Sequence, residues 1–209
     1  MVQRILALSP HTDDCEFGCG GSLARFLAED KEVFYVAFSS AEKSVPPELP
    51  KGILREEVKK ATAALGITRE NLILFDYEVR DFPAHRQSIL EDMIELRDVI
   101  EPDLVFLPSA DDTHQDHQVI AAEGFRAFKK STLLGYEIPW NNLSFRTECF
   151  IFLEEQFIEL KIRALKCYFS QLGRDYINED FIRSLVRARG GQIGTQYAEA
   201  FNAIHWIIR

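Results

Sequence analysis

Short apolar segments alternate with longer amphipathic segments over the first half of the sequence, and this alternation constrains the fold more than any other feature. The apolar segments are four to six residues long and rich in aliphatic, β-branched and aromatic residues, as buried strands are; they cover residues 5–8, 33–38, 72–75 and 104–107. Apolar residues recur at helical spacing in the intervening segments, which cover residues 16–29, 51–65 and 88–100. This alternation predicts βαβ units and an α/β fold, a mainly parallel, doubly wound sheet with helices on both faces.

The pattern is less regular beyond residue 118. We expect elements that extend or cover the sheet: a helix at 119–128, strands at 133–140 and 148–153, and a helix at 155–168. The end of the chain, 187–208, is glycine-rich at first and then apolar, and we assign no element there. The length of 209 residues favours a single domain over 1–209, in which 1–130 form the core and 131–209 complete the pocket.

Composition disfavours several classes of protein. The net charge of −9 argues against nucleic-acid binding, because proteins that bind nucleic acid usually carry a basic surface. The four cysteines are scattered without a CxxC pair, so we expect reduced thiols and a cytoplasmic location. We expect no signal peptide, because the N-terminus leads directly into a strand-like run without a basic segment and a long apolar segment. We expect no membrane span, because no apolar run approaches roughly 18 residues. Aromatic residues such as Trp140 and Trp206 would permit a homo-oligomer.

Two short segments rich in histidine and acidic residues follow two of the expected strands. Residues 10–16 read PHTDDCE, and residues 111–117 read DDTHQDH. Together they hold three of the five histidines and six acidic residues. Because ligands bind at the carboxyl ends of the strands in such sheets, both segments are expected at the edge where chemistry takes place. They provide the ligands for a divalent metal and leave a carboxylate that could act as a base.

The residue types favour a catalytic rather than a structural metal site. His11 and His117, with one carboxylate from Asp13 or Asp14, would give two imidazoles and one carboxylate. Neighbouring side chains point in different directions, so one aspartate can ligate while the other faces the open coordination position. Three protein ligands and an open position are typical of catalytic zinc, and the set also suits iron(II). The second aspartate is then a natural general base, and His114 could stabilise an oxyanion or protonate a leaving amine.

Structural roles compete with chemistry for several of these residues. Asp13 or Asp14 could cap the helix at 16–29, and Asp116 is favoured as a cap of the helix that carries His117. Asp111 and Asp112 are candidates for capping or for outer positions of the site. The glycines at 18, 20 and 21 lack the third glycine of a dinucleotide-binding motif, since Leu23 stands there, and we expect them to allow close packing.

The two His/Asp segments resemble the PIG-L/LmbE-type family of metal-dependent N-acetylglucosaminyl deacetylases. The first family motif is similar to P/A-H-P-D-D-x-E, and residues 10–16 match it except that Thr12 replaces the usual proline. The second motif, H-x-D-H, matches residues 114–117. The resemblance continues through residues 18–21, 55–66 and 189–199, so it covers nearly the whole chain.

This resemblance implies a Rossmann-like fold and a zinc-dependent hydrolase that removes the acetyl group from a GlcNAc-type sugar conjugate. His11, Asp14 and His117 would bind Zn²⁺, with iron(II) as the alternative metal. Asp13 would be the general base that activates the metal-bound water. His114 would stabilise the oxyanion or protonate the amine.

The resemblance also implies substrate contacts for Arg55 and for Tyr197, which matches a tyrosine near the pocket of the thiol-biosynthesis members. Residues 76–87 do not resemble that branch and are similar to members associated with the modification of surface-polysaccharide sugars. Arg86 in this segment could bind a phosphate or a hydroxyl of the substrate, or could belong to a solvated helix start. Two alternative functions stay open: a non-catalytic protein that binds metal and sugar, and a metal-dependent transferase that uses Asp111 and Asp112 with a nucleotide sugar.

Overall fold

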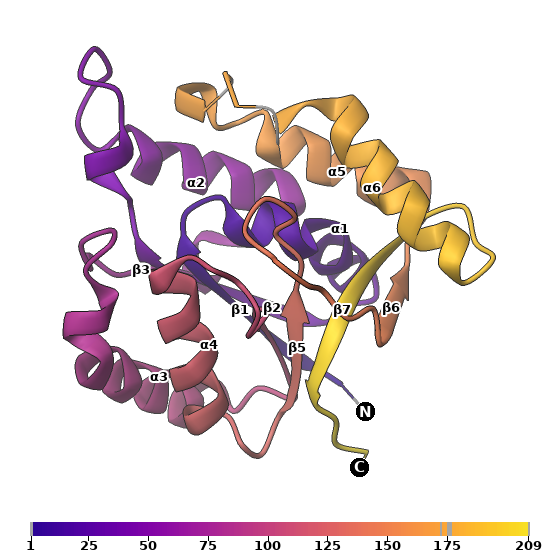
Figure 1. The fold of residues 1–209 in the computed structure, drawn as a ribbon, viewed down its shortest axis with the longest axis horizontal. Coiled ribbons are helices and arrows are strands. Elements are labelled where there is room, and N and C mark those ends of the chain that lie inside the picture. The colour runs from indigo at the N-terminus through magenta and orange to yellow at the C-terminus, as the bar shows by residue number, and fades with distance from the viewer. Residues whose placement is uncertain (1, 172, 175–176, 209) are drawn as a thin grey trace.

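The structure is a computed structural model that describes residues 2–171, 173–174 and 177–208. Within these residues a seven-stranded sheet has the strand order β3-β2-β1-β4-β5-β7-β6 (Figure 1). Five strands run parallel: β1 (Arg4–His11), β2 (Glu32–Ser39), β3 (Leu72–Leu74), β4 (Leu104–Pro108) and β5 (Thr132–Tyr136). Two strands extend the sheet beyond β5 through antiparallel pairings: β7 (Ala198–His205) and β6 (Cys149–Phe152).

Helices cover both faces of the sheet (Figure 1). One face carries α1 (Asp14–Ala28), α2 (Ile53–Leu65), α5 (Glu155–Leu165) and α6 (Glu179–Gln192). The opposite face carries α3 (Arg86–Ile100) and α4 (Gln115–Ala127). Short 3₁₀ helices lie in the connections: η1 (Glu42–Ser44), η2 (Arg69–Asn71), η3 (Phe82–His85) and η4 (Phe169–Gln171). The predicted α/β fold with a mainly parallel sheet is confirmed. Among the described helices, none is both long and apolar enough to cross a membrane.

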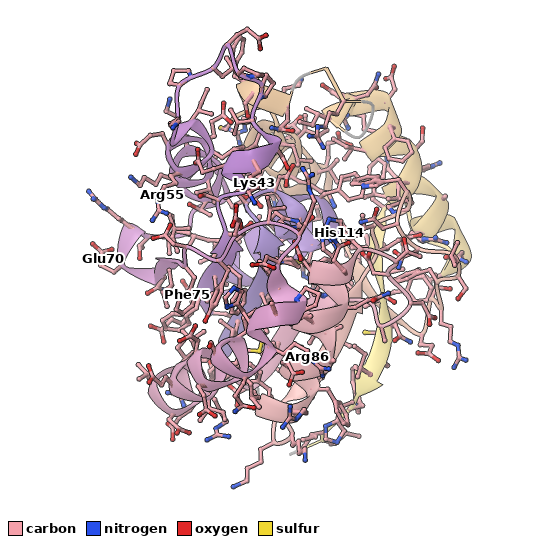
Figure 2. All side chains as sticks on the ribbon, turned by 60° about the vertical axis from the view of Figure 1, so that its left-hand side comes forward. Lys43, Arg55, Glu70, Phe75, Arg86 and His114 are labelled. Carbon is pink, nitrogen blue, oxygen red and sulfur yellow. The ribbon has the colours of Figure 1, made fainter. Side chains whose placement is uncertain are left out.

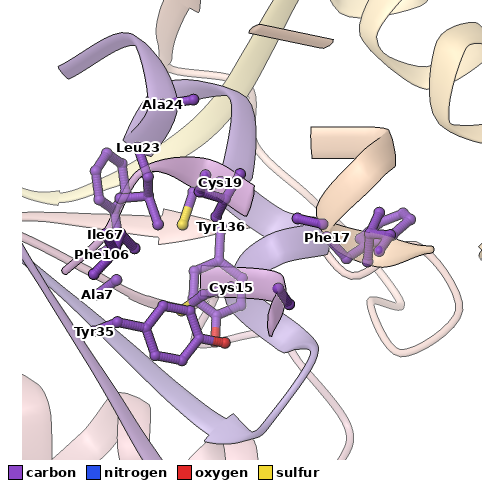
Figure 3. Packing of buried hydrophobic residues seen from close by; sticks show 14 of the residues in the cluster. Ala7, Cys15, Phe17, Cys19, Leu23, Ala24, Tyr35, Ile67, Phe106 and Tyr136 are labelled. Atoms are coloured by element: carbon purple, nitrogen blue, oxygen red, sulfur yellow. The ribbon is translucent and has the colours of Figure 1, made fainter. Parts of the chain in front are cut away.

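Strand β1 shows why the sheet needs helices on both sides. Successive side chains of a strand point to opposite faces, and all four central residues of β1 are apolar and fully buried. Ile5 and Ala7 belong to the hydrophobic cluster under α1, whereas Leu6 and Leu8 belong to the cluster under α3 and α4. Figure 3 shows part of the first cluster, in which Ala7 lies with Cys19 and other residues of α1. A parallel strand that is buried on both faces therefore reads as a continuous apolar run.

Two glycines allow α1 to lie close to neighbouring side chains. A Cβ atom on Gly21 would lie 2.6 Å from a methyl carbon of Leu153 and 3.3 Å from Oε1 of Glu199, and the first distance is closer than atoms can pack. Gly18 lies against the ring of Tyr136 in the same way. Gly18 and Gly21 thus serve close packing, as expected from the sequence, whereas a Cβ atom on Gly20 would find its nearest neighbour at an ordinary 3.5 Å.

The C-terminal third departs most from the sequence-based expectations. The strand expected at 133–140 ends at Tyr136, and the helix expected at 155–168 ends at Leu165. Helix α6 and strand β7 form where no element was assigned. Strand β7 lies between β5 and β6, so the two strands expected in this region are not neighbours in the sheet.

The strand order identifies one edge of the sheet as the place for a ligand. The chain moves from β1 to β2 and β3 on one side, and then returns to place β4 and β5 on the other side. The crevice at the carboxyl ends of β1 and β4 is therefore the topological switch point at which α/β sheets bind ligands. β1 ends at His11, and the connection after β4 leads into α4.

Candidate functional site

The turn between β1 and α1 is short and tightly hydrogen-bonded. His11 is the last residue of β1, and its backbone N–H donates to Oδ2 of Asp14 at 2.8 Å. Ser9 Oγ donates to the carbonyl of His11 at 2.5 Å and accepts from the backbone N–H of Cys15 at 3.1 Å. Asp13 occupies the N-cap position of α1, yet within this described helix its side chain makes no capping hydrogen bond. These bonds fix His11 and Asp14 side by side at the edge of the sheet.

Helix α4 positions the second pair of histidines. His114 is the N-cap residue, and its Nδ1 accepts a hydrogen bond from the backbone N–H of Asp116 at 3.2 Å. The prediction that Asp116 caps α4 is therefore wrong, because the capping group is the imidazole of His114. The backbone N–H of His114 donates to Oδ1 of Asp112 at 2.8 Å, which holds the loop before the helix. His117 follows three residues later on the first turn and faces the same side as His114.

One carboxylate oxygen and two ring nitrogens form a small triangle. Nδ1 of His11 lies 3.2 Å from Oδ2 of Asp14, and Nε2 of His117 lies 3.3 Å from each of these atoms. In a tetrahedral zinc site with bonds of about 2.0–2.1 Å, pairs of ligand atoms are about 3.3 Å apart. The three residues are at most 9% exposed. The triangle therefore has the dimensions and the donor types that a divalent transition metal requires.

A second carboxylate holds each of these two imidazoles from its far side. Nε2 of His11 lies 2.9 Å from Oδ2 of Asp116, and Nδ1 of His117 lies 2.7 Å from Oδ2 of Asp112. Both aspartates are at most 1% exposed. Carboxylates in this arrangement set the tautomer and the orientation of metal-binding histidines. From the sequence, Asp112 and Asp116 are candidates either for helix capping or for outer positions of the site. In the structure, both lie behind the candidate ligands.

The three imidazoles form an alternative candidate set. Ring nitrogens of His11, His114 and His117 lie within 4.8 Å of one another. This spacing is looser than the triangle that includes Asp14, and Nδ1 of His114 is occupied by its capping hydrogen bond. Asp14 therefore fits the third ligand position better than His114 does.

The candidate ligands perturb each other's ionisation. Burial opposes charge on His117, but the carboxylates of Asp14 and Asp112 outweigh it and raise the pKa of His117 to about 10. Burial likewise opposes ionisation of Asp14, and His117 outweighs it, so the pKa of Asp14 is lowered. In the protein chain alone, the charge on His117 stabilises the fold fully below its ordinary pKa of 6.5, and this contribution is lost as the pH rises through about 10. Binding of a metal requires the neutral ring and would release this proton.

His114 has the opposite electrostatic environment. Burial, followed by the neighbouring rings of His11 and His117, lowers the pKa of His114 to about 4. The ring is therefore neutral at neutral pH. Since Nδ1 accepts the backbone N–H of Asp116, the ring proton is on Nε2. His114 is thus equipped to donate one hydrogen bond from Nε2.

All five residues that the sequence predicts for metal and catalysis line one cavity of about 280 Å³: His11, Asp13, Asp14, His114 and His117. Its wall also contains Phe17 and Trp140, whose rings meet edge to face at a centroid distance of 4.6 Å. Arg80 and Arg174 add positive charge to the lining. The sequence analysis named Trp140 only as a residue that would permit a homo-oligomer, and it assigned no site role to Phe17, Arg80 or Arg174. Arg80 does lie in the segment that departs from the thiol-biosynthesis branch.

The three residues expected to contact substrate lie outside the lining of this cavity. Arg55 pairs with Asp76, and Arg86 binds the buried carboxylate of Glu123 at 2.5 Å. Figure 2 shows both arginines apart from His114. Tyr197 lies next to the guanidinium of Arg187, 5.8 Å from ring centroid to Cζ.

The paired aspartates at 111 and 112 do not form a two-carboxylate metal site. Asp111 is exposed and accepts a hydrogen bond from Ser144 Oγ at 3.1 Å. Asp112 is buried and engages His117. The two carboxylates thus serve different partners, which removes the observation that favoured a nucleotide-sugar transferase.

Comparison with known proteins agrees with the sequence motifs. A family model described as PIG-L, GlcNAc-PI de-N-acetylase, matches residues 6–128. The chain belongs to the PIG-L family. This PIG-L protein is 31% identical to the uncharacterized deacetylase YaiS of Escherichia coli K12 over 170 residues, which cover 78% of this chain and 88% of YaiS.

Solved structures share the fold of this PIG-L protein. The N,N'-diacetylchitobiose deacetylase of Pyrococcus horikoshii, complexed with its inhibitor MPG, superposes with a TM-score of 0.80 at 22% identity, covering 96% of this chain and 83% of that one. GalB, the 4-carboxy-2-hydroxymuconate hydratase of Pseudomonas putida KT2440, superposes with a TM-score of 0.76 at 16% identity and covers 99% and 98% of the two chains. Enzymes of different reaction classes therefore share this architecture, and the reaction has to be inferred from the site.

Proposed function

We propose that this PIG-L family member is a metal-dependent N-deacetylase that hydrolyses the acetamido group of a GlcNAc-type sugar conjugate. The observation that carries the proposal is the triangle of His11 Nδ1, Asp14 Oδ2 and His117 Nε2, with Asp13 and His114 lining the same cavity. The names of YaiS and of the Pyrococcus horikoshii enzyme support the reaction class.

The donor set fits zinc or iron(II). His11, Asp14 and His117 would hold the ion, and their two imidazoles and one carboxylate suit both metals. When bound, such an ion polarises a carbonyl and lowers the pKa of water. Asp112 and Asp116 would keep the two imidazoles in the orientation that binding requires.

The remaining residues of the site handle protons and charge. Asp13 accepts a proton from the attacking water as the water oxygen bonds to the acetyl carbon. His114 donates from Nε2–H to the carbonyl oxygen, on which negative charge develops. The proton then passes from Asp13 to the amide nitrogen as the C–N bond breaks. One water is consumed, and the products are acetate and the free amine of the sugar.

The acetyl-bearing ring would lie against the aromatic wall of the cavity. Trp140 is 47% exposed, whereas the Phe17 ring behind it is almost fully buried. Carbohydrate rings have apolar C–H faces, and a fixed aromatic ring gives such a face a large contact area. The cavity therefore combines a polar floor for the amide with an apolar wall for the sugar.

A panel of N-acetylated sugars tests the proposed reaction. With added Zn²⁺ or iron(II), we expect acetate and free amine to appear in equal amounts from GlcNAc conjugates. Chelation of the metal is expected to reduce the rate to background, and metal addition to restore it. Acetate can be measured by a coupled assay and the amine by derivatisation.

Three other outcomes would contradict this proposal. Binding of N-acetyl sugars without acetate release would indicate a non-catalytic member of the fold. Full turnover after complete metal removal would exclude a metal-dependent mechanism. Hydration of an unsaturated carboxylic acid, without hydrolysis of any amide, would place the protein with GalB.

Asp112→Asn tests the support of the metal site. The amide keeps the shape of the side chain but removes the carboxylate that holds His117 Nδ1 at 2.7 Å. We expect the affinity for Zn²⁺ to fall about 10- to 100-fold, as measured by competition with a chromogenic chelator. Asp111→Asn is the matched control, because its exposed side chain binds only Ser144 among the described hydrogen-bond partners, and its affinity should equal that of the wild type.

A further inference from the structure

Arg80 has a backbone conformation that L-residues avoid. Its φ is +72°, and only four described non-glycine residues have positive φ: Asp30, Ala41, Arg80 and Glu101. Glu101 is the C-cap residue of α3, and Asp30 directly follows the C-cap residue of α1. Such conformations are common at the C-terminal ends of helices. Ala41 and Arg80 instead line the cavity that contains the candidate metal ligands. Strained residues that persist at a pocket point to a function of the site.

The backbone of Arg80 is held by the site itself. Its N–H donates to Oδ2 of Asp116 at 2.6 Å, and the same oxygen lies 2.9 Å from Nε2 of His11. The N–H of Phe82 reaches the other carboxylate oxygen at 3.4 Å. This contact explains the position of the backbone, but not the identity of the residue. Glycine would supply the same N–H at the same φ without strain, so the arginine side chain needs a separate explanation.

The guanidinium of Arg80 has no carboxylate partner among the ion pairs of the described residues. Nη2 donates to Ser44 Oγ at 3.2 Å, and among the described residues no carboxylate forms an ion pair with it within 4.0 Å. The acidic residues nearest in sequence are already engaged, since Glu78 pairs with Lys43 and Asp81 with His85. A guanidinium has five donors in a planar fork that matches a carboxylate or a phosphate. Arg80 lines the cavity, and Ser44 accepts from only one of its guanidinium nitrogens.

The charges around the cavity are compatible with an anion at Arg80. Arg174 lines the same cavity and adds a second guanidinium. Asp13 and Asp14 bring negative charge to the metal end, where a divalent ion would offset it. A ligand whose acetamido group reaches that end can therefore place a second, anionic group near Arg80.

We propose that Arg80 determines specificity by binding a phosphate or carboxylate of the substrate, so that the preferred substrate is an N-acetyl sugar that carries negative charge. This inference rests on the proposed deacetylation. It assigns the anion to the exposed guanidinium at the cavity and not to Arg86, which is occupied by Glu123.

Three substrates separate the sources of charge: neutral GlcNAc, GlcNAc 1-phosphate, and a disaccharide of GlcNAc with glucuronate. We expect wild-type protein to show a higher kcat/KM for at least one anionic substrate than for neutral GlcNAc. In Arg80→Gly, the ratio of anionic to neutral kcat/KM should fall about 10- to 100-fold, the loss typical of a hydrogen bond to a charged group. The anion that suffers this fall identifies phosphate or carboxylate as the recognised group.

Two variants control for charge and for folding. Arg80→Lys keeps the charge but not the fork, and it should retain an intermediate preference. Arg97→Gln removes an exposed guanidinium on α3 that pairs with Asp98, and it should keep the wild-type ratio. Because glycine suits the backbone at position 80, Arg80→Gly should melt within a few degrees of the wild type, on the order of 2 °C.

An unchanged ratio in Arg80→Gly, or an equal loss on neutral and anionic substrates, would overturn the role of Arg80. If wild-type protein releases no acetate from any sugar, the proposed function fails instead. In that case the proposed binding of an anion by Arg80 is tested by calorimetry, with glucose 1-phosphate and glucose as ligands of the metal-loaded protein. Preferential binding of the phosphate that is lost in Arg80→Gly supports the inference, and equal binding of the two sugars overturns it.

Discussion

Asp13→Ala is expected to lose acetate release while it keeps its metal ion. Asp13 lines the cavity next to Asp14 but is not part of the triangle of candidate ligand atoms. Removing a general base typically lowers the rate about 10²- to 10⁴-fold. Metal content by elemental analysis and kcat for acetate release would be measured on the same preparation, so that loss of activity cannot be confused with loss of metal.

Two further aspartates make this test specific. Asp14→Ala removes a candidate ligand and should lose metal and activity together. Asp111→Ala changes an exposed aspartate of the second segment and should retain both. Turnover near the wild-type rate in Asp13→Ala would show that another group takes the proton from water.

Lys161→Met is expected to lower the free energy of unfolding more than any other substitution considered above. The Lys161 ammonium is 2% exposed and lies 2.5 Å from Oε1 of Glu199, which is itself buried. It also donates to the carbonyl of Phe17. Without Lys161, the Glu199 carboxylate would stay buried without its cation, although Gly21 and Ser22 still donate to it. Removing one partner of a buried ion pair typically costs about 3–5 kcal/mol.

Urea denaturation measures this loss as a lower midpoint at an unchanged slope. Lys166→Met is the matched control, because Lys166 forms an ion pair with Glu179 in which both side chains are at least 40% exposed. Such surface pairs contribute about 0–1 kcal/mol. Equal losses in the two variants would show that the buried pair of α5 and β7 is not a major source of stability.

The first half of the fold and the meeting of the two His/Asp segments could be predicted because their signals are local. Buried parallel strands such as β1 read as short apolar runs, and the histidines follow the strand ends directly. Once two strands are adjacent in the sheet, His11 and His117 must meet at the same edge although 106 positions separate them. The topology converts two local patterns into one site.

The C-terminal elements could not be predicted as well, for two different reasons. Helix α6 had readable signals, since Asn178 caps it and Ile182 and Val186 lie four residues apart on its buried side. Gly190 and Gly191 obscured these helix signals, because glycine is unfavourable inside a helix. Strand β7 starts with four consecutive buried residues that include alanine and glutamate, so it has neither the alternation of a half-exposed strand nor its typical composition.

The substrate side of the site could not be predicted because side-chain partners far apart in sequence decide it. Arg86 lies in a distinctive segment, but a carboxylate 37 residues away, Glu123, binds it outside the cavity. The role of Asp116 was hidden for a similar reason, since its partners His11 and Arg80 come from other elements. The spacing of residues in the sequence identifies side chains that can come into contact, whereas tertiary packing decides which of them do.

The bond between the backbone of residue 80 and Asp116 has a consequence for how such enzymes diversify. The amide N–H holds the carboxylate that orients His11, and every residue except proline carries that N–H. A residue that tolerates the positive φ at position 80, such as glycine, could therefore replace Arg80 while the bond to Asp116 is kept. On the proposed role of Arg80, such a substitution would change the substrate preference without disturbing the contact between Asp116 and His11.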